Sequence, residues 1–134
     1  MSSGLKYTFL VHAVVAFVFG VGLVLAPEWL RERVNWTSAD PAMARAYGTA
    51  LLAICLSSWL GFRAEEWKQV RIIVRMENAF TIIGFLTGLY TVLFADGPSF
   101  VWSSVVISAV FGVLFGYFGR APQAKAVPAP QAAH

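Results

Sequence analysis

Charged residues are scarce in this chain, and their scarcity excludes an ordinary soluble domain. Only 13% of the 134 residues are charged and 58% are apolar, whereas soluble domains carry roughly 25% charged residues. The net charge is only +3, and the ten Lys and Arg residues lie between apolar runs without forming a basic stripe. We therefore expect a chain that lies mostly in a lipid bilayer and has no nucleic acid partner.

Cysteine and the common catalytic patterns are also nearly missing. Cys55 is the one cysteine and lies inside an apolar run, which excludes an intrachain disulfide, a redox pair and a cysteine-ligated metal. The sequence has no Ser-His-Asp pattern, no metal-ligand spacing and no paired acids. We expect no enzyme, no catalytic or metal site and no cofactor. A membrane enzyme or lipid-modifying protein ranks behind the two functions considered below.

Four apolar runs are long enough to cross the roughly 30 Å of bilayer hydrocarbon as α-helices. They cover residues 7–26, 42–62, 74–94 and 100–119. Pro27 ends the first run, which favours a spanning helix over a secretory signal peptide. We expect residues 1–120 to form one all-α transmembrane domain, an antiparallel four-helix bundle.

The links between these runs have their own chemistry. Residues 28–41 mix charged and aromatic side chains and are typical of a segment in the headgroup zone. Asp40 followed by Pro41 predicts the start of a helix, and residues 95–98 predict a tight turn. Residues 121–134 are rich in Pro and Ala and are expected to form a disordered cytoplasmic tail.

Basic residues in the links predict the orientation, because Lys and Arg near span ends are retained in the cytoplasm. Seven of them fall on one side: Lys6, Arg63, Lys68, Arg71, Arg75, Arg120 and Lys125. Three fall on the other side: Arg31, Arg33 and Arg45. The sequence thus predicts a multi-pass protein of the cell (inner or plasma) membrane with both termini cytoplasmic.

Small residues recur at fourth positions, a spacing that lets membrane helices approach closely. The fourth run carries Ser104, Ser108, Gly112 and Gly116, and the third carries Gly84 and Gly88. The second and first runs show shorter versions, with Ala53, Ser57 and Gly61, and with Ala16 and Gly20. We expect the fourth run to present a packing face, either within the monomer or between two copies.

His12 is the strongly polar residue of the first run and the first candidate for a polar or ligand site. If the third helix starts early, Glu77 lies at a comparable depth, as do Ser57 and Ser58, so a contact between His12 and Glu77 is permitted. The cluster is interpreted as an interhelical hydrogen bond or, alternatively, as a proton-coupled or ligand-holding site. A haem or chlorin ligand is a third alternative, but one histidine offers a single axial bond.

Arg45, Tyr47 and Tyr90 are further candidates near the predicted outer interface. The long stem of Arg45 can carry its charge up to the headgroups. Alternatively it turns inward and binds an anionic group. In that case oxygens at similar depth would line the pocket, from Thr87, Tyr90, Thr91 and Ser103.

Three short sequence signatures occur in order along the chain: LAPEWL at the end of the first run, DPAMARAYGTALLA opening the second, and FADGPS between the third and fourth. Over residues 20–119 the chain resembles uncharacterised small four-span bacterial membrane proteins, loosely similar to the DoxX-like proteins. This resemblance implies the four-span topology and no activity. The chain lacks the acid in the last helix and the Gly-Arg pair in the third helix that parts of that group carry. The resemblance therefore implies no shared ligand site.

Two functions remain. The first is a non-enzymatic structural or accessory bundle, which has the bilayer as its surroundings and a second copy or another membrane protein as its partner. The alternative is a small transporter or channel for a small solute. It would act as a dimer, because four helices enclose little free space.

Overall fold

The computed structural model describes residues 1–36, 40–95 and 97–120, and it is all-helical over these residues. The helices are α1 (Ser3–Leu25), α2 (Pro27–Arg33), α3 (Pro41–Arg63), α4 (Trp67–Phe94) and α5 (Val101–Phe118). All but α2 are long and apolar enough to cross a membrane. The predicted all-α class and the four candidate spans are confirmed. The predicted tail and Asp96 of the predicted turn lie outside the described residues.

Local capping explains where two of the long helices begin. The Ser2 hydroxyl accepts a hydrogen bond from the Leu5 N–H at 3.3 Å and starts α1. The Asp40 carboxylate accepts from the N–H groups of Ala42 at 2.6 Å and Met43 at 3.3 Å. Pro41 follows as the first residue of α3, where its missing N–H costs nothing. The predicted start of this helix is confirmed.

Helix α4 begins at Trp67, well before residue 74, where the third span was expected to start. The side-chain oxygen of Gln69 accepts hydrogen bonds from the N–H groups of Glu65 and Glu66, at 3.2 and 3.3 Å. This cap satisfies donors that the first turn of a helix leaves free. The charged link after α3 is therefore largely the first two turns of α4, and Val70 in it is fully buried.

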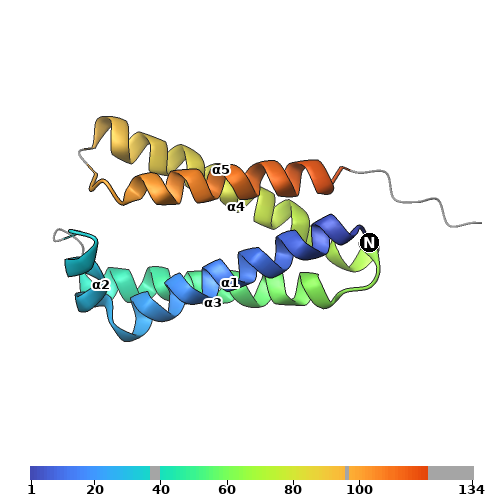
Figure 1. Ribbon diagram of the computed structural model, residues 1–134, viewed down its shortest axis with the longest axis horizontal. Helices are drawn as coiled ribbons and strands as arrows, with labels where there is room; N and C mark the ends of the chain where they lie inside the picture. The colour runs from blue at the N-terminus through green and yellow to red at the C-terminus, as the bar shows by residue number, and fades with distance from the viewer. Residues whose placement is uncertain (37–39, 96, 121–134) are drawn as a thin grey trace, which may run out of the picture.

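The long helices are arranged as two pairs. Helices α1 and α3 pack along each other, as do α4 and α5, and fewer contacts join one pair to the other. Figure 1 shows the α1–α3 pair below the α4–α5 pair, with α2 at the left. The chain start, the link from α3 to α4 and the end of α5 lie together at the right. We call this the N-terminal end, and the opposite end the α2 end.

A cluster of buried apolar residues lies near the N-terminal end and joins the two pairs. Its members come from α1, α4 and α5: Leu5, Phe9, Val70, Val74, Phe111 and Phe115. The rings of Phe9 and Phe115 contact each other across the pairs, with centroids 5.2 Å apart. This cluster fixes the ends of three helices and thereby positions the polar residues that follow it along each helix.

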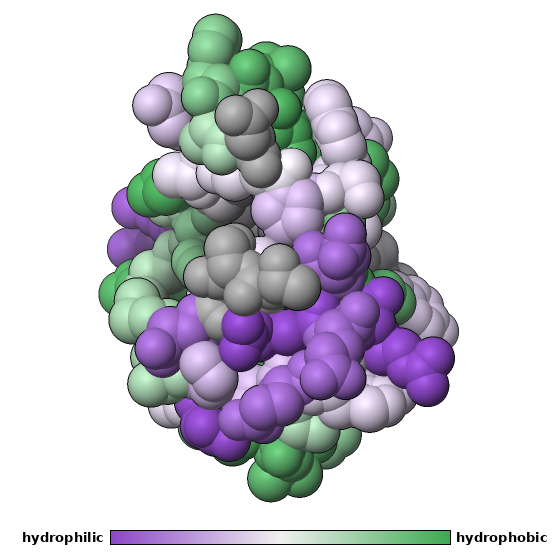
Figure 2. Space-filling view, turned by 90° about the vertical axis from the view of Figure 1, so that its left-hand side faces the viewer, coloured by the Kyte–Doolittle hydropathy of each residue, from purple (hydrophilic) through white to green (hydrophobic). Residues whose placement is uncertain are grey.

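Large apolar side chains are exposed along all four long helices, which a water-soluble bundle would avoid. Those that are more than half exposed include Val14, Phe17, Val18, Leu56, Leu60, Ile83, Leu86, Val106 and Val113. Hydrophilic residues instead gather at the ends. Figure 2 looks at the α2 end and shows them over the lower half, where α2 lies, with apolar surface above them. This distribution suits a chain whose sides face hydrocarbon.

Candidate functional site

A buried polar cluster lies where the two helix pairs meet. His12 comes from α1, Ser58 from α3 and Glu77 from α4, and their exposed fractions are 5%, 0% and 2%. The His12 Nδ1 atom lies 2.9 Å from the Ser58 hydroxyl oxygen, and that hydroxyl donates to Glu77 Oε1 at 3.0 Å. Three helices thus share one hydrogen-bonded chain.

Helix α5 completes the surroundings of the cluster with aromatic rings. The His12 ring packs against Phe111 at a centroid distance of 4.4 Å and against Phe115 at 5.3 Å, nearly edge to face. His12 follows Phe9 by one turn and Glu77 follows Val74 by one turn, so both continue the buried faces of the apolar cluster. The polar residues are therefore held by packing on the side toward the N-terminal end.

The hydrogen bond from Ser58 to Glu77 fits one tautomer of His12. When the one hydroxyl proton of Ser58 is donated to Glu77, the Ser58 oxygen is left as the acceptor toward the histidine, which matches a hydrogen on Nδ1. Glu77 Oε2 lies 3.5 Å from Nδ1 and is buried without a hydrogen-bond partner among the residues that the structure describes. A second proton-binding position is therefore present beside the imidazole.

The order of these groups differs from that of a catalytic triad. In a triad the histidine lies between the serine and the acid, and it removes the serine proton. Here Ser58 lies between the histidine and the carboxyl group, donates its proton to the carboxyl group, and is fully buried. The geometry does not activate Ser58 as a nucleophile.

Arg45 lies at the α2 end and forms an ion pair that the sequence did not suggest. Its Nη2 atom is 3.0 Å from Glu28 Oε1, and about half of each side chain is exposed. The pKa of Glu28 lies below its ordinary value, first because of a backbone hydrogen bond at Glu28 and then because of the Arg45 charge. Three of the four residues expected to line an inward pocket donate their hydroxyls to backbone carbonyls three or four residues earlier: Thr87, Thr91 and Ser103.

The two tyrosine candidates are separated by the fold. Tyr47 lies in the second turn of α3, at the α2 end, and its side chain is 45% exposed. Tyr90 is 63% exposed, and its ring packs beside Phe94 of the same helix. The structure therefore brings His12 and Glu77 together, and it places Arg45, Tyr47 and Tyr90 in separate surroundings.

The small residues of α4 and α5 lie against each other within the monomer. A β-carbon on Gly84 would lie 3.1 Å from the Ser108 hydroxyl, and one on Gly88 would lie 2.9 Å from a Val105 methyl group. Toward the N-terminal end there is more room. There a β-carbon on Gly112 would lie 3.4 Å from the Thr81 hydroxyl oxygen, and one on Gly116 would lie 3.2 Å from the Asn78 amide nitrogen.

Two features that are central in the structure were not predicted from the sequence. Ser58, noted only for its depth, is the bridge of the polar cluster. Gly48 was not noted at all, yet a β-carbon there would lie 2.9 Å from the Gly20 carbonyl oxygen. The sequence did contain a signal for this contact. Gly20 lies before the α2 segment and Gly48 after it, at similar distances along α1 and α3. Among the described residues, no three His, Cys, Asp or Glu side chains group closely enough to hold a metal ion.

Comparison with known proteins gives no match: no family model, curated protein or solved structure is similar to this chain. The resemblance to small four-span bacterial membrane proteins therefore stays a prediction, and function has to be argued from the site.

Proposed function

We propose that this chain is a non-enzymatic, multi-pass protein of the cell membrane that serves as a structural or accessory bundle. The observation that carries the proposal is the buried contact of His12, Ser58 and Glu77 between the two helix pairs. In hydrocarbon such groups find no water, so hydrogen bonds between helices satisfy them and hold the helices in register. The rings of Phe111 and Phe115 pack against the His12 ring, as in a packing contact between helices.

The proposed topology is an antiparallel four-helix bundle with both termini cytoplasmic. Support comes from the position of the charges: the N-terminal end carries most of the Lys and Arg residues, and the α2 end carries Arg31, Arg33 and Arg45. The α2 segment, with its hydrophilic residues and Trp29, would then lie in the outer headgroup zone. A partner, whether a second copy or another membrane protein, would meet the exposed apolar sides.

A small transporter, acting as a dimer, is the second candidate. The observation that favours it is the unsatisfied Oε2 atom of Glu77, 3.5 Å from His12 Nδ1. Ionisable groups at membrane depth are costly, and they frequently mark proton or ion pathways. Glu77 and His12 would exchange a proton during transport.

Proton flux into liposomes separates the two candidates. Purified protein is reconstituted with an internal pH dye, and a potassium diffusion potential is applied. For a structural bundle we expect no flux above protein-free liposomes, with thermal stability in detergent that falls in Ser58→Ala. Flux in the wild type that Glu77→Gln abolishes, without loss of stability, would establish the transporter instead.

Glu65→Gln is the matched control for this substitution. Glu65 lies on the link before α4, and its side chain is exposed. It therefore undergoes the same chemical change outside the cluster. Flux lost equally in Glu65→Gln and Glu77→Gln would rule out a pathway through the cluster.

A further inference from the structure

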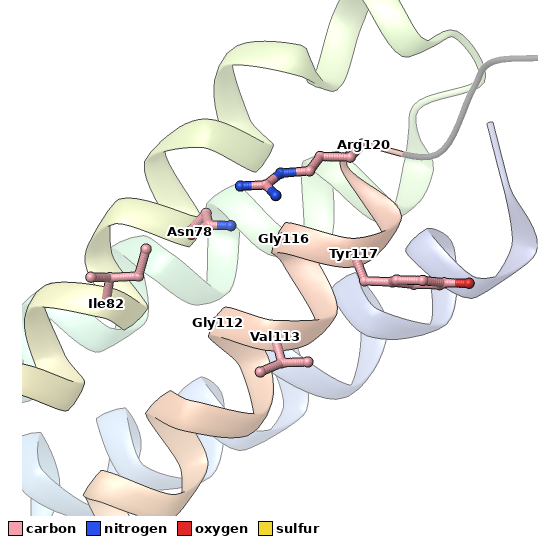
Figure 3. A pocket seen from close by; sticks show the side chains of 7 residues that line it. All are labelled: Asn78, Ile82, Gly112, Val113, Gly116, Tyr117 and Arg120. Carbon is pink, nitrogen blue, oxygen red and sulfur yellow. The ribbon is translucent and has the colours of Figure 1, made fainter.

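A groove runs along the outer side of α4 and α5, away from the polar cluster. A cavity of about 640 Å³ lies between Asn78 and Ile82 of α4 and the face of α5 from Gly112 to Arg120. This volume lies within the roughly 300–1,000 Å³ of small-molecule sites. Figure 3 shows the lining residues on the two helices, with Asn78 and Ile82 on α4 and with Gly112 and Gly116 on α5.

The groove continues toward the middle of the helices. A second cavity of about 350 Å³ shares Ile82, Gly112 and Val113 with the first, and it adds Phe85 and Ala109. Thr81 and Ser108 also line the second cavity, and the rest of its lining is apolar, whereas the first cavity has the polar side chains of Asn78 and Arg120 at one end. The two cavities together form one groove in the surface, which is polar at the N-terminal end and mostly apolar beyond it.

Arg120 supplies the polar end with a positive charge. Figure 3 shows its side chain turned back from the end of α5 toward Asn78, while the Tyr117 ring points away from the groove. Within the described part of the chain, neither the Arg120 guanidinium nor the Asn78 amide has a hydrogen-bond or ion-pair partner. No acidic side chain lines either cavity. The guanidinium is thus free to bind an anion.

We propose that this groove binds one anionic phospholipid, with its phosphate on Arg120 and Asn78 and an acyl chain along Ile82, Phe85, Ala109 and Val113. The inference rests on the proposed insertion in a membrane, in which the groove faces lipid. Guanidinium groups bind phosphate through paired, charge-assisted hydrogen bonds. A flexible acyl chain can fill a narrow apolar groove that a rigid helix would not enter.

The charge of the surroundings favours an anionic over a zwitterionic headgroup. Five more cations lie at the N-terminal end: Lys6, Arg63, Lys68, Arg71 and Arg75. Among the described residues at this end, the exposed acids are Glu65 and Glu66. Basic residues close to a membrane surface attract anionic lipids, and the proposed orientation places them at the cytoplasmic leaflet.

Native mass spectrometry of the full chain in detergent tests the site. The protein is titrated with phosphatidylglycerol or with phosphatidylcholine carrying the same acyl chains. We expect about tenfold tighter binding of phosphatidylglycerol, and this preference should disappear in Arg120→Gln. Arg63→Gln, which removes an exposed charge at the same end but outside the groove, should keep it.

A second pair of variants tests the acyl position. Val113→Trp fills the groove and should weaken the binding of both lipids. Val106→Trp, also exposed on α5 but outside the groove lining, should not. Circular dichroism establishes that each variant is folded.

Three results would overturn the proposal. The first is equal binding of the two lipids by the wild type. The second is an equal loss of the phosphatidylglycerol preference in Arg63→Gln and Arg120→Gln. The third is a dimer that Val113→Trp dissociates, because a second copy of the chain would then occupy the groove. Release of the chain from membranes by alkaline carbonate would contradict membrane insertion itself. Lipid selectivity and membrane insertion are thus tested separately.

Discussion

Glu77 shows at the scale of a single residue what a buried carboxyl group requires. Removing such a group from water costs free energy unless hydrogen bonds replace those lost. One oxygen of Glu77 accepts from Ser58, and the other lies beside His12 with no hydrogen bond to any residue that the structure describes. Because His12 also bonds to Ser58, both ionisable groups depend on one hydroxyl.

Replacing that hydroxyl should be costly. We expect Ser58→Ala to lower the free energy of unfolding in detergent by about 1–2 kcal/mol, because it removes two interhelical hydrogen bonds. Thr49→Ala on the same helix is the control, since its exposed hydroxyl bonds only to the carbonyl of Arg45. Equal stability of the two variants, measured by denaturant unfolding, would contradict a stabilising role for the cluster.

For a single residue, the sequence predicts how far along a helix the side chain lies, but not which side of the helix it is on. The comparable depth of His12 and Glu77 permitted their contact. Ser57 and Ser58 lie at nearly the same depth, and only the fold decides that Ser58 is fully buried. The pairing of Arg45 with Glu28 depends on how α2 folds back after Pro27. Such a contact arises from tertiary structure and leaves no local pattern.

At the scale of the helix, α1 and α3 approach each other closely at two glycines, Gly20 and Gly48. A β-carbon on Gly48 would lie 2.8 Å from Leu23 Cβ, and one on Gly20 would lie 2.9 Å from Leu52 and 3.1 Å from the Gly48 carbonyl oxygen. Backbone atoms cannot move aside as side-chain ends can. The absence of side chains at these two glycines is therefore what lets the helices touch.

Leucine at Gly48 should separate α1 from α3. We expect a loss of about 1–3 kcal/mol in the free energy of unfolding, as overpacking typically causes. Gly22→Leu, whose β-carbon would lie 3.6 Å from Leu30, should cost less. Gly112→Leu should also cost less, because Gly112 borders the groove. A loss in Gly112→Leu that equals or exceeds the loss in Gly48→Leu would place the critical packing on α5 instead.

The sequence predicts the helices better than it predicts their ends. Apolar runs locate the four candidate spans, since hydrocarbon thickness sets a minimum length. The start of α4 was misplaced because charged residues in its first two turns look like a link. The Gln69 cap and the burial of Val70 extend the helix into them.

At the scale of the whole molecule, hydropathy and loop charge predict the number of spans and their direction, but not which helices are neighbours. Four spans can be paired in several ways with the same links. The association of α1 with α3 and of α4 with α5 rests on matching small residues, such as Gly20 with Gly48 and Gly84 with Ser108. Partner choice therefore depends on pairs of positions that periodicity within one run does not reveal.

Cysteine labelling tests the proposed orientation. In a Cys55→Ser background, we introduce Ser3→Cys, Glu32→Cys or Glu65→Cys. An impermeant maleimide should label Glu32→Cys in intact cells, because α2 would lie outside. It should label Ser3→Cys and Glu65→Cys only after permeabilisation. Labelling of Ser3→Cys in intact cells would contradict a cytoplasmic N-terminus, and labelling of Glu65→Cys would contradict a cytoplasmic link.

The order in which the ribosome makes the chain gives the cluster a role in assembly. Chains fold from the N-terminus as they emerge, so α1 and α3 are complete before Glu77 is synthesised. His12 and Ser58 can then already be in contact, so that the proposed membrane insertion of α4 brings Glu77 to a hydrogen-bonding site that is already formed. Burying the Glu77 carboxyl group should cost less free energy when this site exists. A fault in the first pair should thus appear as failed insertion of the second.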